Sequence, residues 1–127
     1  MIYIRGQAKD FDLWAQAGAT GWDWESVKPY FVGSVDQSRG PSPWHSSKGP
    51  LRLEDIKFKL PVCDALIAAG IKTGLAYNED FNSADQEGIG YYQTTMRNGR
   101  RWSAANAYLD GIRNRSNLTI KTQAPID

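Results

Sequence analysis

Tyr91-Tyr92-Gln93-Thr94-Thr95-Met96, closely followed by Asn98-Gly99, is the stretch that decides the fold. Aromatic and β-branched side chains favour strands, and Asn-Gly is a strong signal for a tight hairpin turn. The preceding segment, residues 77–90, is polar and rich in Asn, Asp and Gly, which favour turns. The sequence therefore predicts a strand at 91–96 that leads out of a loop into a tight turn.

Helical spacing of apolar residues marks four further segments. Apolar residues recur at intervals of three and four within residues 10–17 and 24–33, which predicts two short amphipathic helices. Residues 61–74 give the strongest helix prediction, because Pro61 suits a first turn and Gly74 suits a helix end. Ser103 can cap a last helix that continues to Leu109.

Brief alternation of apolar and polar residues predicts short strands at 51–53 and 118–120, and a short strand or an extended arm at 1–5. Residues 34–50 show neither period, so we expect an exposed loop there, with the single histidine, His45, in solvent. The predicted fold class is α+β and loop-rich, with three or four short helices around a few mostly antiparallel strands.

Composition limits the partners and the location that we expect. Fifteen basic and fourteen acidic residues give a net charge of +1, which provides no field that attracts nucleic acid. There is no apolar run long enough for a membrane span and no signal-peptide pattern at the start, so we expect a cytoplasmic protein. Cys63 is the only cysteine, which suits a reducing compartment, and we expect it to be a small buried residue.

The usual ligand and phosphate motifs are incomplete. One His and one Cys do not make a metal site, so none is predicted. Residues 80–85 break the calcium-loop pattern, and local turn hydrogen bonds explain their Asn and Asp residues better. Gly88 and Gly90 lack the third glycine and the following helix of a phosphate-binding loop.

A basic cluster leaves two interpretations open. It consists of Arg97, Arg100, Arg101, Arg113 and Arg115, and Trp102 lies within it. Trp102, or Trp44 elsewhere, could stack on a base or sugar in a small carbohydrate- or nucleotide-binding domain. The alternative is a solvated cluster that flanks a helix.

Several stretches, taken together and in this order, resemble a known family. They are Met1-Ile2-Tyr3-Ile4-Arg5-Gly6, Asp10-Phe11-Asp12-Leu13-Trp14, Gly21-Trp22-Asp23-Trp24, Asp80-Phe81-Asn82, Gln86-Glu87-Gly88-Ile89-Gly90 and Asn98-Gly99-Arg100-Arg101-Trp102-Ser103-Ala104-Ala105. This pattern is similar to the segment that follows the flavin-attachment loop in glucose-methanol-choline (GMC) oxidoreductases, with the strongest likeness to choline dehydrogenase-like members. The likeness covers nearly the whole chain but a minority of a full-length member.

The resemblance implies an FAD-dependent alcohol oxidoreductase from which essential parts are missing. Family members hold the flavin pyrophosphate on a Gly-rich Rossmann turn, and no G-x-G-x-x-G occurs here. The family also uses a histidine near its C-terminus as a base, a role that the surroundings of His45 do not match. We therefore expect the chain alone to bind no cofactor, and we assign no catalytic residue.

The resemblance also implies an order of segments within a single domain of residues 1–127. Residues 1–33 would form a helical segment next to the flavin lid, residues 34–50 a loop, and residues 51–127 a portion of the substrate-binding region. The fold is thus expected to be a fragment of the lid and substrate-binding region of a flavoenzyme.

Four residues are the site candidates that the resemblance gives for a complete enzyme. Tyr3 and Arg5 would lie nearest the cofactor, and Tyr92 and Gln93 nearest the substrate. A packed aromatic ring or a polar side chain facing a neighbouring strand is an equal interpretation for each of them.

A non-catalytic interaction module is the remaining alternative. Surface left uncovered by the missing flavin domain could be buried in a homo-oligomer. Exposed sheet edges, which would lose partner strands in such a fragment, favour the same association.

Overall fold

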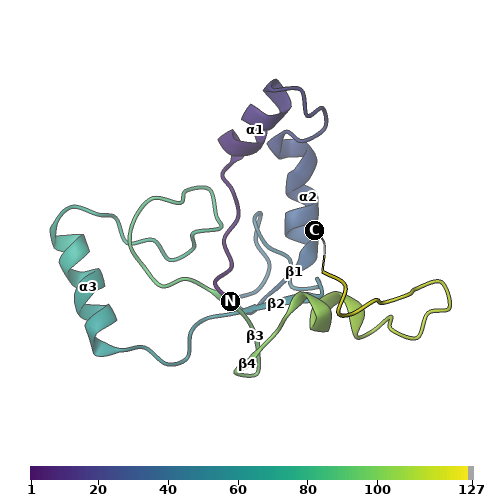
Figure 1. Cartoon of the computed structure of the whole chain (residues 1–127). Coiled ribbons are helices and arrows are strands. Elements are labelled where there is room, and N and C mark those ends of the chain that lie inside the picture. The colour runs from purple at the N-terminus through teal and green to yellow at the C-terminus, as the bar shows by residue number, and fades with distance from the viewer. Residues whose placement is uncertain (126–127) are drawn as a thin grey trace.

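The computed structural model describes residues 1–125 of the chain, and residues 126 and 127 of the predicted substrate-region segment lie outside them. The fold is α+β, as the sequence predicted, and Figure 1 shows the helices lying to either side of a small sheet. The elements are α1 (Ala8–Gln16), α2 (Trp24–Ser34), β1 (Val35–Gln37), β2 (Leu51–Glu54), α3 (Pro61–Lys72), β3 (Thr94–Arg97), β4 (Arg100–Arg101) and a π-helical turn, η1 (Ala105–Leu109).

The four strands form one mixed sheet in the order β1-β2-β3-β4. β1 pairs in parallel with β2, and Val35 lies opposite Leu51. β2 pairs antiparallel with β3, and β3 with β4, so two of the three pairings are antiparallel. The β3–β4 turn contains Asn98 and Gly99, both with positive φ, which is the hairpin that Asn-Gly predicts.

An N-terminal arm, residues 1–7, runs along the edge of β3 that β4 leaves free. Ile2 forms an antiparallel bridge with Thr94. The Thr95 N–H donates to the Met1 carbonyl at 2.8 Å, and the Tyr3 N–H donates to the Gln93 carbonyl at 3.0 Å. The second and the ninety-fourth residues of the chain therefore lie opposite each other.

Aromatic packing joins α1 to α2. The ring of Phe11, which is buried, lies 5.4 Å from that of Trp14, 5.6 Å from that of Trp24 and 5.4 Å from that of Phe31, measured between centroids. Asp23 caps α2 by accepting a hydrogen bond from the Ser26 N–H at 3.0 Å. The two predicted helices are confirmed.

Helix α3 is also confirmed, and Figure 1 shows it set apart from the sheet at the end of two connections. Pro61 lies in its first turn, and Gly74, with φ of +101°, turns the chain away after its end. The side chain of Ile89 lies against Gly70, where an added Cβ would come within 2.6 Å of the Ile89 Cδ1 atom. This contact fastens α3 to the loop that precedes β3.

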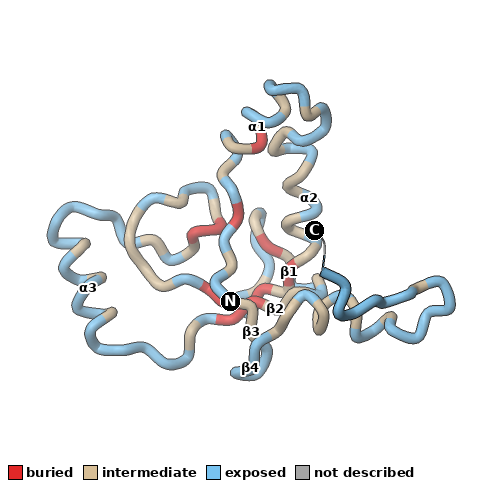
Figure 2. Tube along the Cα trace, viewed as in Figure 1, coloured by how far each residue is buried: buried red, intermediate tan, exposed pale blue. Residues whose placement is uncertain are grey.

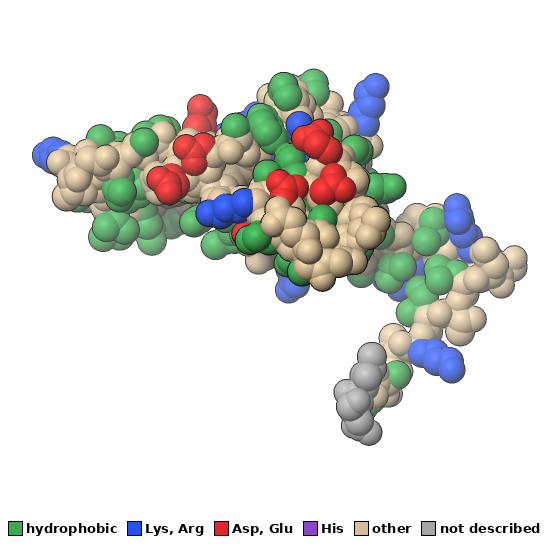
Figure 3. Space-filling view, turned by 90° about the horizontal axis from the view of Figure 1, so that it is seen from above, with side chains coloured by type: hydrophobic (Ala, Val, Ile, Leu, Met, Phe, Trp, Pro, Cys, Tyr) green, Lys and Arg blue, Asp and Glu red, His purple; other side chains and the backbone are tan. Residues whose placement is uncertain are grey.

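The apolar core is small. Val35 and Leu53 are fully buried side chains, and Phe11 and Phe81 are the other buried hydrophobic residues among those described. Figure 2 shows buried positions gathered where the sheet, the arm and the loop before β3 meet. Figure 3 shows hydrophobic side chains on the surface near α3, and those exposed there include Phe58, Leu60, Val62 and Leu66.

The prediction of an exposed loop at 34–50 is wrong in two respects. Residues Val35–Gln37 form β1, whose side chains alternate between buried and half-buried positions. His45 is 3% exposed, not solvated, because its ring is enclosed beside Asp80. A three-residue strand is too short to show a period in the sequence, so only its pairing with β2 reveals it.

Three smaller predictions also need correction. Residues 118–120 form no strand, since no neighbouring segment in the described chain pairs with them. The predicted helix after Ser103 is the π-helical turn η1, and Cys63 is half-buried instead of buried.

In residues 1–125, no helix is both long and apolar enough to cross a bilayer.

Candidate functional site

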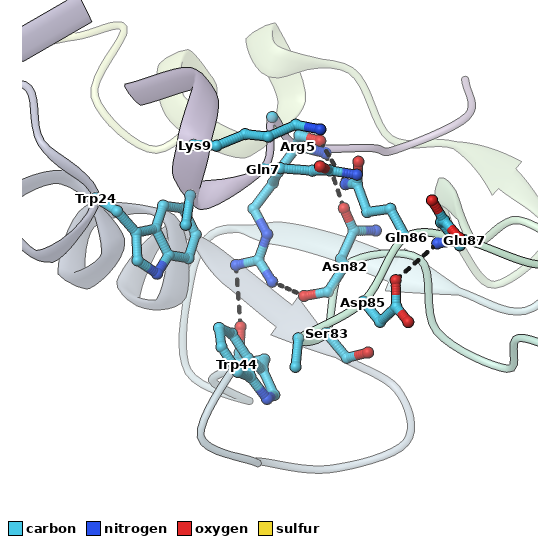
Figure 4. A pocket seen from close by; sticks show the side chains of 13 residues that line it. Arg5, Gln7, Lys9, Trp24, Trp44, Asn82, Ser83, Asp85, Gln86 and Glu87 are labelled. Atoms are coloured by element: carbon cyan, nitrogen blue, oxygen red, sulfur yellow. Dashed lines mark hydrogen bonds between the residues drawn. The ribbon is translucent and has the colours of Figure 1, made fainter. Parts of the chain in front are cut away.

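The N-terminal arm, the 78–90 loop (residues 78–90) and two tryptophans enclose a hollow of about 280 Å³ (Figure 4). The arm and the start of α1 form one wall and the 78–90 loop the opposite one. The lining residues are Arg5, Gly6, Gln7, Ala8, Lys9, Trp24, Trp44, Asn82, Ser83, Ala84, Asp85, Gln86 and Glu87. One of the four predicted site residues, Arg5, therefore lies in this wall.

The guanidinium of Arg5 links two loops. Its Nη1 donates to the Trp44 carbonyl at 3.0 Å, and its Nη2 donates to the Asn82 carbonyl. Figure 4 shows the guanidinium between these two residues. Arg5 is 6% exposed, so its charge is held by carbonyl dipoles in place of water.

Backbone groups of the arm are bound as well. The Arg5 N–H donates to Asn82 Oδ1 at 2.8 Å, and Asn82 Nδ2 donates to the Tyr3 carbonyl at 3.0 Å. Gln86 Nε2 donates to the Arg5 carbonyl at 2.6 Å. We call Arg5, Asn82 and Gln86 the arm clamp. Asn82 and Gln86 bind N–H and carbonyl groups of the arm backbone, and the Arg5 side chain binds carbonyls outside the arm.

Burial changes the ionisation of the arm residues. It raises the pKa of the Tyr3 hydroxyl, while the nearby Arg5 charge acts in the opposite direction. Burial lowers the pKa of Arg5, and Tyr3 and Asp80 oppose that change. A guanidinium remains charged at neutral pH despite such a decrease.

Local turn hydrogen bonds shape the 78–90 loop, as its Asn and Asp content predicted. Asn78 Oδ1 accepts from the Asp80 N–H at 2.8 Å, and Asp80 Oδ1 accepts from the Asn82 N–H at 2.9 Å. A side chain at Gly90 would overlap the carbonyl of Asn78, so the loop closes only with glycine there. These turns present Asn82 to the arm.

His45 supports the same loop through Asp80. Its Nε2 lies 2.6 Å from Asp80 Oδ2, and its Nδ1 is buried with no hydrogen-bond partner in the described structure. Burial alone would raise the pKa of Asp80, but the hydrogen bonds from His45 and from the Asn82 N–H outweigh it and lower that pKa.

The two predicted substrate-side residues lie next to the arm. Gln93 is 4% exposed, and its amide exchanges hydrogen bonds of 2.6 and 2.9 Å with Gln37. Its Nε2 also donates to Asp55 Oδ1 at 2.8 Å, so this amide is engaged within the protein. Tyr92 packs on Phe81 with centroids 4.6 Å apart.

The two tryptophan rings that could stack on a ligand each have a positively charged side chain of the same chain lying over them. Arg97 lies over Trp102 at 4.3 Å from the ring centroid, and Lys28 lies over Trp44 at 4.4 Å. Trp102 Nε1 also donates to the Pro50 carbonyl at 2.9 Å. These contacts favour the structural interpretation of the basic cluster.

Sequence reasoning placed Tyr3 and Gln93 in separate groups, and the structure joins them through one backbone hydrogen bond. It missed Asn82 and Gln86, whose side chains bind the arm. Both residues lie in turn-rich stretches that carry the family resemblance, but neither signal identifies a partner some eighty residues away.

The described residues do not fit FAD by themselves. Dinucleotide sites place the pyrophosphate where a Gly-rich turn leads from a strand into a helix, and no such turn occurs among residues 1–125. The hollow in Figure 4 has a volume of about 280 Å³, slightly below the range of about 300–1,000 Å³ that is usual for ligands much smaller than a dinucleotide.

Comparison with known proteins gives the class of protein. The GMC oxidoreductase family matches residues 1–127. The fold agrees: pyridoxine 4-oxidase from Mesorbium loti superposes with a TM-score of 0.86 and 35% identity over 94% of this chain and 24% of that one. The chain therefore belongs to the GMC oxidoreductase family.

Individual relatives show which members of the family the chain resembles. The chain is 42% identical to oxygen-dependent choline dehydrogenase from Brucella anthropi and 41% identical to that from Rhizobium johnstonii, each over 94% of this chain. An FAD-dependent oxidoreductase from Chaetomium thermophilum superposes with a TM-score of 0.81 at 25% identity, over 92% of this chain and 22% of that one. The chain spans only 22% of the length of these choline dehydrogenases.

Proposed function

We propose that this chain forms part of an FAD-dependent alcohol oxidoreductase of the choline dehydrogenase type. The observation that carries the proposal is the family match over residues 1–127, joined to 42% identity with a choline dehydrogenase. Choline dehydrogenase and pyridoxine 4-oxidase both appear among its relatives, so a small hydroxylated molecule is the substrate class that we propose.

The proposed role of each segment comes from the family resemblance, and the arrangement of the arm and β3 supports it. The arm carries Tyr3 and Arg5 toward the flavin, and residues 91–95 carry Tyr92 and Gln93 toward the substrate. The hydrogen bond between Tyr3 and Gln93 supports this assignment, because it places the two groups on adjacent backbones. When FAD is bound in a complete enzyme, the cofactor supplies the redox chemistry.

The 127-residue chain by itself is proposed to be cofactor-free and inactive. Support comes from the poor fit of its residues to FAD and from His45, whose ring is buried against Asp80 and so has no access to a substrate hydroxyl. We also propose the cytoplasmic location that the sequence indicated.

Visible absorbance tests this proposal. The purified chain is mixed with FAD, passed through a desalting column, and assayed for choline-dependent reduction of a dye. We expect no flavin absorbance bands in the protein fraction from the column, and no dye reduction. Retained flavin bands or turnover would contradict the inactive state.

A graft tests the family activity. Replacing the matching segment of the Brucella anthropi choline dehydrogenase by this chain is expected to preserve FAD content and alcohol-dependent dye reduction. A folded graft that retains FAD but oxidises neither choline nor pyridoxine would count against the proposed substrate class.

Self-association is a second proposal, favoured by the apolar side chains on and beside α3. Phe58 is 77% exposed, Val62 69% and Leu66 65%. Contact between such apolar side chains and water is unfavourable, and burying them against a second copy would remove it. Light scattering that shows a monomer across a wide range of concentrations would contradict it.

A further inference from the structure

Apolar burial does little to hold the N-terminal arm against the rest of the protein. Met1 is 55% exposed, Ile2 59% and Ile4 50%, so these side chains gain little from the position of the arm. The backbone pairing with β3 covers only its first three residues. Polar contacts must therefore fix the remainder.

We propose that Arg5 is a positioning residue which, together with Asn82 and Gln86, keeps the arm in register with residues 93–95 and so fixes Tyr3 beside Gln93. This inference rests on the proposed function, in which Tyr3 lies toward the cofactor and Gln93 toward the substrate. In this role Arg5 acts through the position of Tyr3.

The geometry of the guanidinium supports this role. Two of its nitrogens reach two carbonyl oxygens in different loops, those of Trp44 and Asn82. A planar fork holds both in fixed directions, whereas the single ammonium of lysine has no such geometry. Removing the fork would leave two carbonyls without their partner beside a residue that is only 6% exposed.

The remaining contacts make the clamp specific to the arm. Asn82 binds both the Arg5 N–H and the Tyr3 carbonyl, and Gln86 binds the Arg5 carbonyl. All three bonds are made to backbone atoms between Tyr3 and Arg5, so they determine the path of the chain and not only its stability. The Tyr3 N–H then faces the Gln93 carbonyl.

Amide hydrogen exchange in the flavin-free chain tests this role. The reporters are the N–H groups of Tyr3 and Thr95, which bond to Gln93 and Met1 across the arm–β3 pair. Arg5→Ala is expected to accelerate exchange at both by about tenfold, and Arg5→Lys nearly as much. The carbonyl carbon of Gln93 should also shift as its hydrogen bond weakens.

Two reference amides and one control variant separate positioning from general stability. Ser38 N–H bonds to the Leu53 carbonyl, and Ala17 N–H bonds to the Leu13 carbonyl, and neither bond involves a residue of the arm. Their exchange should stay within about twofold of the unmodified chain. Lys9→Ala removes an exposed positive charge from the same hollow without breaking a clamp bond, and should change neither reporter.

Gln86→Ala decides the outcome if Arg5→Ala unfolds the protein, because it deletes only the bond to the Arg5 carbonyl. Faster exchange confined to Tyr3 and Thr95 supports the proposal. Unchanged reporters, or equal acceleration at Ser38 and Ala17 in Gln86→Ala, overturn it. No flavin is present, so this result is independent of the absorbance and graft experiments.

Discussion

His45 Nε2 lies 2.6 Å from Asp80 Oδ2, a contact that joins two loops thirty-five residues apart in sequence. The imidazole is buried and the carboxylate half-exposed, so the pair connects the segment between β1 and β2 to the 78–90 loop. Because Asp80 Oδ1 also binds the Asn82 N–H, the same carboxylate supports the arm clamp. Its charge state should therefore affect the clamp.

Acid should weaken this part of the protein through Asp80. Its folded-state pKa is below the usual value, since hydrogen bonds from His45 and Asn82 outweigh burial. Such a carboxylate stabilises the fold above its unfolded pKa, and this contribution is lost as pH falls through the folded pKa. As the pH falls below about 5 and through the folded pKa, Asp80→Asn should lose less stability than the unmodified protein in denaturant titrations.

Asp85→Asn is the matched control for Asp80, because it removes an exposed carboxylate from the same loop while the new amide oxygen can still accept from the Glu87 N–H. Its denaturation midpoint should follow the unmodified protein at each pH. Parallel pH profiles for Asp80→Asn and the unmodified chain would contradict the role given to Asp80.

Gly90→Ala should destabilise the protein by roughly 1–3 kcal/mol, because the new methyl group would overlap the Asn78 carbonyl and the backbone must move. Gly33→Ala is the control: it lies within α2 with nothing within 4 Å of the added carbon. That change should stabilise by about 0.5–1 kcal/mol through helix propensity. Urea unfolding of the two variants measures both effects, and equal midpoints would refute the assignment.

Leu53→Ala should cost about 2–5 kcal/mol, since Leu53 is fully buried in the sheet and its loss leaves a cavity. Leu66→Ala on α3 should change stability by no more than about 0.5 kcal/mol, because that side chain is 65% exposed. Thermal unfolding followed by circular dichroism compares the two. A larger cost for Leu66 would indicate that the α3 face is covered in solution.

Arg5→Ala should raise the pKa of Tyr3 further. Burial already raises it, and the Arg5 charge is the main opposing influence. Arg5→Lys keeps a positive charge nearby and should raise it less. Titration of the tyrosine ring carbon by NMR gives the values, and a decrease in the alanine variant would disprove the charge effect.

The sequence predicted the helices well because each carries its own signal. Pro61 and the apolar spacing after it locate α3, and Asp23 caps α2. The hairpin at Asn98-Gly99 is similarly local. In each case neighbouring residues contain the information that determines the structure.

Contacts between distant segments were not predictable in the same way. β1 has three residues and is defined by its pairing with β2. His45 is buried because it lies against Asp80, a residue distant in the sequence. The site candidates came from the family resemblance, which gave Tyr3 and Gln93 but not the hydrogen bond between them. Asn82 and Gln86 act on the arm from almost the other end of the chain, so no local pattern reveals them.

The separate position of α3 has a consequence for how the molecule unfolds. Its links to the remainder include the Gly70–Ile89 contact and a bond of 2.7 Å from the Tyr91 hydroxyl to Asp64. An element attached by so few interactions behaves as its own foldon and opens before the sheet does. Melting of the chain should then proceed in two stages, and the midpoint of each variant is the one for the stage that unfolds its substituted residue.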